Sequence, residues 1–350
     1  MTEKNYGGAS DFGIKNKPIK KQSKKFIDKT QKNNTKIPSD SKAENLNSPQ
    51  ENKEIEKIKK AGQVASKVRD YAKTFIKPNM PLLEIAEEIE AKILSLNAKP
   101  AFPVTLCINE ITAHSTPSYN SQEKASGLLK VDFGVHIDGF IADTAFTIDF
   151  SENQEESKEN SSLIQAAESA LKKAAEIAKL NSQVSKIGEE ISKTIESFNF
   201  SPIRNLSGHS IKEYSLHSGI TIPNFNNTSQ LKLSEGLYAI EPFATLSSAS
   251  GLVREGKLSG IYHLEKIGPV RDTKAREVLQ FIIDEYQTLP FCSRWIYKKF
   301  GARGLISLKQ IESSGLLHHY PQLIESSGKK VAQAEHTILI TKNEMIVTTK

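Results

Sequence analysis

The sequence predicts an α+β fold in which pairs of helices cover an antiparallel sheet, with a helical subdomain inserted near the C-terminus. Residues 53–271 repeat a coarse plan, in which two helical patterns precede strand patterns that contain acidic residues. Residues 131–150 alternate apolar and polar side chains about a HIDG turn, as a β-hairpin does. Between about 272 and 330, three short helical patterns followed by strand patterns indicate a winged-helix-like insertion.

The length and composition indicate a soluble, cytoplasmic protein. A chain of 350 residues with 37% hydrophobic content can form one large or two medium domains. No stretch approaches the roughly 18 uninterrupted apolar residues of a membrane span, and the polar N-terminus lacks the apolar segment of a signal peptide. Cys107 and Cys292 are far apart in the sequence, which favours neither a disulfide framework nor a zinc knuckle.

Most of the net charge of +6 lies at the N-terminus, where residues 1–52 hold eleven lysines and six acidic residues. This segment is rich in Asn, Ser and Gln and poor in large apolar residues, so we expect a disordered tail. Two interpretations stay open. The tail is either a solubilising segment, or a basic arm that makes transient electrostatic contact with an RNA-rich partner such as the ribosome.

Proline- or glycine-containing segments separate several of the successive helical and strand patterns. Apolar residues from Lys53 to Phe75 recur every three or four positions, which predicts a helix that ends at the KPNMP segment. The other predicted elements are a helix over 82–96, proline-broken extended chain over 100–117, the hairpin over 131–150, an acidic loop over 151–162, helices over 163–180 and 184–198, and strands and loops over 203–246.

The insertion is predicted to begin near Asp272 and to end near Lys330. Its expected elements are helices over 273–286, 290–300 and 305–317, and a strand–turn–strand unit over 320–340. Residues 53–271 and 331–350 would then form a single domain around it. The chain closes on the apolar strand EHTILIT.

Two aspartates of the predicted hairpin lie in strand segments whose other residues are mostly apolar. A two-residue turn at Ile137–Asp138 would set Asp132 directly opposite Asp143, whereas a turn at Asp138–Gly139 would make them diagonal neighbours. Both registers place the two carboxylates on one face, where they repel each other unless a cation lies between them. A pair of metal ions roughly 3.5–4 Å apart resolves this repulsion. Asp138 itself is expected to be an ordinary turn residue.

Three distant residues are candidates to complete a metal site. His209 follows a glycine in SGHS, Glu241 lies on an apolar strand in AIEPFA, and Glu335 begins the last apolar strand. Imidazole and carboxylate groups together suit Mn, Fe, Co or Zn.

The order and surroundings of these five residues, in KVDFGVHIDGFIADTAFT, LSGHSI, AIEPFA and AEHTILI, resemble the methionine aminopeptidases from about residue 53 onward. The resemblance implies the pita-bread fold and two divalent metal ions (Co, Mn, Fe or Zn). It implies as ligands Asp132, Asp143, His209, Glu241 and Glu335. The insertion between Glu241 and Glu335 resembles the type II branch of archaea and eukaryotes.

The resemblance also implies a function and further site residues. The enzyme would be a monomer that removes the N-terminal methionine of nascent polypeptides before a small second residue, by means of a metal-activated water. Its implied catalytic residues are His114, His217 and Glu241, the last as general acid and base. Its implied substrate-binding residues are Phe102, His114, His217, Phe243 and Tyr320.

Two alternatives remain at this point. Peptidases of the prolidase or aminopeptidase P type use the same five ligands, although they usually have a sizeable N-terminal domain where this chain has a tail. The proliferation-associated relatives lost metal ligands and bind RNA or ribosomes. The basic tail fits them, but the five intact ligand positions do not.

Overall fold

The structure is a computed structural model that describes residues 49–350. The predicted tail lies outside the described residues except for its last four positions, which belong to the first helix. The helices of the described part are α1 (Pro49–Phe75), α2 (Leu82–Ser95), α3 (Gln154–Ile177), α4 (Val184–Ser197), α5 (Thr273–Glu285) and α6 (Ser293–Ser313).

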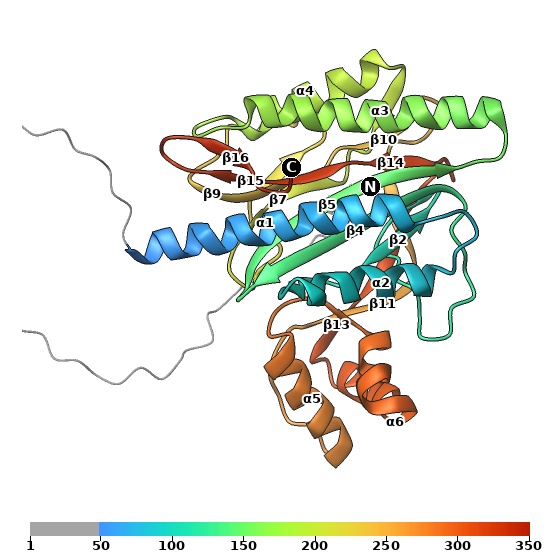
Figure 1. Cartoon of the computed structure of the whole chain (residues 1–350), viewed down its shortest axis with the longest axis vertical. Coiled ribbons are helices and arrows are strands. Elements are labelled where there is room, and N and C mark those ends of the chain that lie inside the picture. The colour runs from blue at the N-terminus through green and yellow to red at the C-terminus, as the bar shows by residue number, and fades with distance from the viewer. Residues whose placement is uncertain (1–48) are drawn as a thin grey trace, which may run out of the picture.

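A large sheet runs through the middle of the molecule (Figure 1), with strand order β1-β4-β5-β15-β9-β7-β8, β2 beside β4 and β16 beside β15. Every pairing in it is antiparallel, as the sequence predicted. Its strands are β1 (Lys99–Pro100), β2 (Thr105–Ile108), β4 (Gly127–Ile137), β5 (Phe140–Phe150), β7 (Ser207–Ile211), β8 (Thr221–Pro223), β9 (Gly236–Ile240), β15 (Glu335–Ile340) and β16 (Met345–Val347).

Two smaller sheets complete the described part of the chain. One has the order β14-β10-β6 and the other β12-β11-β13-β3. Their strands are β3 (Ile111–Ala113), β6 (Phe200–Pro202), β10 (Phe243–Leu246), β11 (Val253–Leu264), β12 (Phe291–Cys292), β13 (Leu317–Glu325) and β14 (Val331–Gln333).

The helix pairs divide the core into two similar halves. The apolar faces of α1 and α2 pack on β2, β4 and β5 in one cluster, whereas α3 and α4 pack on strands that include β9 and β15 in another. Figure 1 shows the two pairs lying along the large sheet, with α5 and α6 projecting below α2. This arrangement confirms the predicted fold class of helix pairs on an antiparallel sheet. None of the helices between residues 49 and 350 has the length and apolar character that crossing a bilayer requires.

The hairpin of β4 and β5 turns at Asp138 and Gly139, which settles the register that the sequence left open. Their φ angles are 50° and 88°, and positive φ at both central residues is the geometry that matches the twist of a two-residue hairpin. Asp132 therefore pairs with Ala145, and Asp143 pairs with Gly134. The two aspartates are diagonal neighbours on one face.

The predicted acidic loop over 151–162 is wrong, because α3 begins at Gln154. Asn153 caps the helix: its side-chain oxygen accepts hydrogen bonds from the backbone N–H groups of Glu155 and Glu156. Acidic side chains in the first turn also favour a helix start, since they face its positive end. Further along, the buried Asn160 donates to Asp149 and to Ser151. The acidic residues therefore lie in the first turns of α3 and not in a loop before it.

The strand–turn–strand unit predicted over 320–340 is not a hairpin. Its first strand, β13, pairs with β11 and β3, whereas its second part forms β14 and β15 in the other two sheets. The second and third predicted helices are the two segments of α6, which meet at a kink at Gly301, where the backbone is not helical (φ 64°, ψ −157°). Tyr262 and Leu264 of β11 belong to the apolar cluster of α5 and α6, so the helices pack on a strand that precedes them in the sequence.

Glu325 joins two turns at the end of β13 and is fully buried. Its carboxylate accepts five hydrogen bonds, from the backbone N–H groups of Ser250, Ser327 and Lys329 and from both serine hydroxyls, at 2.7–3.0 Å. We expect Glu325→Ala to lower the free energy of unfolding by about 1–3 kcal/mol, because it removes the buried carboxylate whose five hydrogen bonds hold the two turns together.

Urea denaturation measures this loss, with the exposed Glu344→Ala as the matched control, expected to stay within about 0.5 kcal/mol of wild type. Equal stability of the two variants would contradict the role given to Glu325.

Candidate metal centre

One cavity gathers side chains from the large sheet and from the sheet of β11 and β13. Its lining residues are Phe102, Pro103, Thr105, His114, Asp132, Asp143, His209, Leu216, His217, Glu241, Ile261, Pro290, Tyr320 and Glu335. The five predicted ligands therefore share a cavity with four of the five predicted substrate-binding residues.

The strand order explains why residues so distant in sequence meet. Asp132 lies on β4, Asp143 on β5, Glu335 on β15 and His209 on β7, and Glu241 directly follows β9. These strands are successive neighbours in the sheet. Residues paired across antiparallel strands point to the same face. Asp132 and Glu335 both pair with Ala145 of the strand between them, and Asp143 lies two residues before it. All three carboxylates therefore project from the same face.

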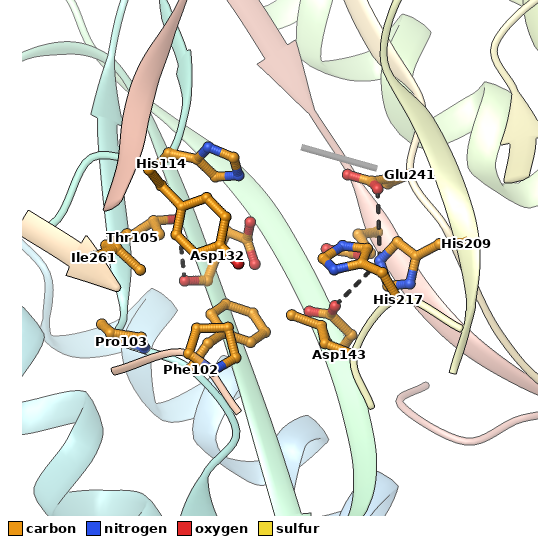
Figure 2. A pocket seen from close by; sticks show the side chains of 14 residues that line it. Phe102, Pro103, Thr105, His114, Asp132, Asp143, His209, His217, Glu241 and Ile261 are labelled. Carbon is orange, nitrogen blue, oxygen red and sulfur yellow. Dashed lines mark hydrogen bonds and ion pairs between the residues drawn. The ribbon is translucent and has the colours of Figure 1, made fainter. Parts of the chain in front are cut away.

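The side chains converge on a common point. Ligand atoms of Asp143, His209 and Glu335 all lie within 4.8 Å of one another. The Nε2 atom of His209 is 3.7 Å from Oδ2 of Asp143 and 3.8 Å from Oε1 of Glu241, which is too long for a good hydrogen bond. Figure 2 shows Asp143, His209 and Glu241 turned toward one another, with Asp132 facing them across the cavity. Spacings of this kind suit a cation between the ligands.

Three carboxylates each have a buried oxygen that accepts no hydrogen bond from the described residues: Oδ1 of Asp132, Oδ1 of Asp143 and Oε1 of Glu241. A buried carboxylate oxygen without a donor is costly, and proteins keep such groups chiefly where they coordinate an ion. Oxygen ligands with one imidazole suit divalent transition ions. The residues present therefore fit the divalent metals that the sequence predicts.

The protonation of the site follows from its burial. Burial raises the pKa of Asp132 to about 7. Burial, followed by the neighbouring carboxylates, raises the pKa values of Asp143, Glu241 and Glu335 well above their usual range. Burial lowers the pKa of His209 to about 4, so its imidazole is neutral at pH 7 and able to bind a metal. A divalent cation would displace protons from the carboxylates.

Two threonines that sequence reasoning missed hold the central ligands in place. The hydroxyl of Thr337 accepts from the backbone N–H of Asp143 at 2.7 Å and donates to its carbonyl at 2.9 Å. The hydroxyl of Thr144 donates to the carbonyl of Glu335 at 3.0 Å. Both residues are fully buried. Their hydrogen bonds connect β5 to β15 beside the predicted ligands. Threonine is common in β-strands, so no signal in the sequence distinguished these two residues.

The predicted histidines and tyrosine border the cavity. The ring of His217 lies 4.1 Å from that of His209, centroid to centroid, and the ring of His114 lies 5.5 Å from that of Tyr320. Nδ1 of His114 is 3.2 Å from the carbonyl oxygen of Pro321. Burial lowers the pKa of His114 to about 4 and that of His217 well below its usual value, so both imidazoles are neutral at pH 7.

Phe243, predicted as a pocket residue, does not line the cavity. It is fully buried in a separate apolar cluster with Ile203, Leu206 and other residues. A continuous strand would have placed it on the same face as Glu241. The chain instead leaves the large sheet after Ile240 and joins β14 and β6 at Phe243. This change of sheet turns the side chain away.

The sequence also missed part of the cavity wall, namely Pro103, Thr105, Leu216 and Ile261. Pro103 and Thr105 lie one and three residues after Phe102, so the prediction of Phe102 as a pocket residue could have been extended to them. Ile261 reaches the wall from β11, on an ordinary apolar strand, and no local sequence signal identifies it.

Comparison with known proteins gives relatives over most of the chain. Residues 56–342 match metallopeptidase family M24. The methionine aminopeptidase of Pyrococcus abyssi is 44% identical over 303 residues, which cover 85% of this chain and 100% of that protein. The methionine aminopeptidase of Methanocaldococcus jannaschii is 41% identical over 298 residues, 84% of this chain and 98% of the other.

Solved structures share the fold at lower identity. A thermophilic Arx1 matches with a TM-score of 0.72 and 15% identity over 85% of this chain and 90% of its own. The methionine aminopeptidase of Rickettsia prowazekii matches with a TM-score of 0.61 and 22% identity over 85% and 98%. Because the family match extends over nearly the whole described part and the cavity holds the ligand set, the chain belongs to metallopeptidase family M24.

Proposed function

We propose that this protein removes the N-terminal methionine from polypeptides with a small second residue, using two divalent metal ions of the Co, Mn, Fe or Zn class. The observation that supports this most strongly is the convergence of Asp143, His209 and Glu335 within 4.8 Å, beside carboxylate oxygens that accept no hydrogen bond from the described residues. The relatives over the whole domain are methionine aminopeptidases. The protein is accordingly a hydrolase of the exopeptidase type.

The metal ions would be held by Asp132, Asp143, His209, Glu241 and Glu335. Divalent ions, when bound, lower the pKa of a water from about 15.7 toward about 7 and polarise a scissile carbonyl. The sheet holds the five side chains on neighbouring strands, so their positions need little rearrangement on binding.

Glu241 moves the proton in this scheme. Its Oε1 atom takes a proton from the attacking water and returns it to the departing amine nitrogen. In the metal-free site, burial keeps the pKa of this carboxyl well above its usual range, and bound cations would lower that pKa again. A general acid and base works best when its pKa lies near the working pH.

His114 and His217 bind the peptide. Both are neutral at pH 7 because burial lowers their pKa values, so each imidazole has one N–H donor and one acceptor nitrogen. The N–H of His114 donates from Nδ1 to the carbonyl oxygen of Pro321, which leaves Nε2 to accept from the scissile amide N–H. His217 would donate its N–H to the carbonyl oxygen, on which negative charge develops.

The first side chain of the substrate occupies the apolar part of the cavity. Phe102, Ile261, Pro290 and Tyr320 contribute to its lining. An unbranched, polarisable thioether adapts well to an irregular apolar slot. This wall selects methionine, and the natural substrates are nascent polypeptide N-termini.

The cellular setting follows from the same proposal. We expect a cytoplasmic monomer of the type II branch. A transient contact with the ribosome through residues 1–52 rests on their lysines alone, since residues 1–48 lie outside the described part.

A peptide panel tests the function. We expect the metal-loaded protein to release methionine from Met-Ala-Ser about 100-fold faster, in kcat/KM, than it cleaves Leu-Ala-Ser or Ala-Pro-Ser. Chelation should remove the activity, and Mn, Fe, Co or Zn should restore it. Amino-acid analysis of the products measures the rates.

The panel also separates the alternatives. Preferred cleavage before proline would indicate a peptidase of the prolidase or aminopeptidase P type. Absence of hydrolysis with every metal would indicate a binding protein on this fold and would contradict the proposal.

A further inference from the structure

A buried ion pair connects α2, which packs on the large sheet, to α6 of the insertion. The guanidinium of Arg294 donates from Nη1 to Oε2 of Glu90 at 2.8 Å and from Nη2 to Oε1 at 2.7 Å. The indole N–H of Trp295 donates to the same carboxylate at 2.8 Å. Glu90 is 7% exposed and Arg294 is 2% exposed. The carboxylate therefore fixes three N–H donors of α6 in one geometry.

Glu90 belongs to a rigid part of the molecule. Its neighbours on α2, Ile85, Ile89 and Ile93, are fully buried in the core beneath the large sheet. Figure 1 shows α2 lying between that sheet and the two helices of the insertion. Glu90 can thus serve as a fixed point against which α6 is held.

The other end of the ion pair is close to the cavity wall along the chain. Pro290 lines the cavity, and the next two residues form β12, which pairs with Ile261 and Tyr262 of β11. Ile261 also lines the cavity. Arg294 follows only four residues after Pro290, in the first turn of α6. A displacement of α6 would therefore move Pro290.

Aromatic stacking connects this wall to the ion pair. The ring of Tyr286 stacks on Phe291 at 5.0 Å and on Trp295 at 5.5 Å between centroids. Phe291 directly follows Pro290 in the sequence. The wall residue, the aromatic stack and Trp295 therefore form one packed unit that Glu90 holds by a hydrogen bond.

Arg294 also holds the segment of His114, which lines the cavity as well. Its Nε donates to the carbonyl of Pro117 at 3.2 Å. Pro117 lies three residues after His114. The side chain of His114 lines the cavity, and its backbone is in the left-handed region, with φ of 59°. One guanidinium thus connects α2, the wall of the insertion and the segment of His114.

A buried ion pair of this kind adds little net stability, because desolvation of both charges offsets much of their attraction. Its bidentate geometry does fix orientation strongly. We propose that Glu90, acting through Arg294 and Trp295, is a positioning residue that sets the wall of the cavity and thereby the selectivity for the first side chain of the substrate. This inference rests on the proposed aminopeptidase function.

Glu90→Gln tests it, since glutamine keeps the shape but turns an NH2 group toward the donors of Arg294 and Trp295. We expect KM for Met-Ala-Ser to rise about tenfold and the preference for Met-Ala-Ser over Leu-Ala-Ser to fall about fivefold, with kcat changed less than about threefold. Assays are run well below the melting temperature of each variant. A purely structural role would reduce the active fraction, and so kcat for both peptides equally, with KM and the preference unchanged.

Glu87→Gln is the matched control. Glu87 lies one turn before Glu90 on the same helix and pairs with Lys298 of α6 at 3.7 Å, but both side chains are exposed. We expect wild-type KM and preference from this variant. A second test variant, Trp295→Phe, removes only one donor to Glu90 and should change KM and preference in the same direction by about threefold.

The outcomes separate the two proposals. Wild-type KM and preference in folded Glu90→Gln would overturn the positioning role alone. If Glu90→Gln does not fold, the same result in Trp295→Phe overturns it. A wild-type protein that releases no methionine with any metal overturns the proposed function and this inference together.

Discussion

Replacement of Asp143 by asparagine, or of His209 or Glu335 by alanine, is expected to abolish metal-dependent release of methionine, with kcat/KM falling by about three orders of magnitude or more. The ligand atoms of these residues lie within 4.8 Å of one another, so each variant removes a ligand that no neighbour replaces. The proteins should still fold. Removing a buried carboxylate or imidazole also removes its desolvation cost.

Asp138→Asn is the control for Asp143→Asn, because both aspartates belong to the same hairpin. Asp138 lies in the turn with a side chain that is 70% exposed and pairs with Lys57. Asparagine tolerates its positive φ, so this variant should retain wild-type turnover. Metal content and peptide turnover are measured together for each protein. Full activity in any of the three ligand variants would exclude the assigned metal centre.

The metal-free protein is expected to lose stability as the pH rises from about 6.5 to 8. Burial raises the folded pKa of Asp132 to about 7, and burial with mutual repulsion raises those of Asp143, Glu241 and Glu335 well above their ordinary values. The folded protein therefore binds more protons than the unfolded chain in this range, and the free energy of unfolding falls with pH. Each carboxyl still protonated in the folded state contributes about 1.4 kcal/mol per pH unit.

Other groups limit the window in which this effect is seen. The buried His114 and His209 have pKa values of about 4, below the ordinary 6.5, so they increase stability as the pH rises toward 6.5 and have little effect above it. Burial lowers the pKa of Lys130 to about 8, which opposes the carboxylates above pH 8. The carboxylates therefore dominate between these limits.

Thermal unfolding in the presence of a chelator measures the effect, and we expect the melting temperature to fall by several degrees across the window. Added Mn²⁺ or Co²⁺ should reverse the fall and stabilise more at pH 8 than at pH 6.5, since binding releases protons. Glu335→Gln should reduce the pH dependence, because one proton site is lost. A melting temperature that rises with pH in the metal-free protein would contradict the raised pKa values.

The sequence predicted the metal centre better than it predicted the wall of the cavity. Asp132 and Asp143 share a face in either hairpin register, so that inference did not depend on the turn. His209, Glu241 and Glu335 had only local signals, a histidine after a glycine and two carboxylates in apolar strand segments, and the resemblance to methionine aminopeptidases implied them as a set. Ile261 is an apolar residue on a strand, and only the tertiary arrangement of β11 brings it to the cavity.

The errors in the fold have a common physical origin. At Phe243 the chain changes sheets directly after Glu241, and at Val331 it leaves the neighbourhood of β13 without pairing back on it. Alternation along a strand predicts which face a side chain occupies, but it does not predict the partner strand. The start of α3 was missed for another reason, because an acidic first turn with an asparagine cap also has the composition of a loop.

The place of β15 has a consequence for how this protein is made. It is inserted between β5 and β9 in the middle of the large sheet, although it is almost the last strand to be synthesised. Until residues 335–340 have left the ribosome, β5 and β9 each present an unpaired edge, and the centre lacks Glu335. The chain must therefore be synthesised almost to its end before the centre can form, and we expect a chain terminated before β15 to be inactive.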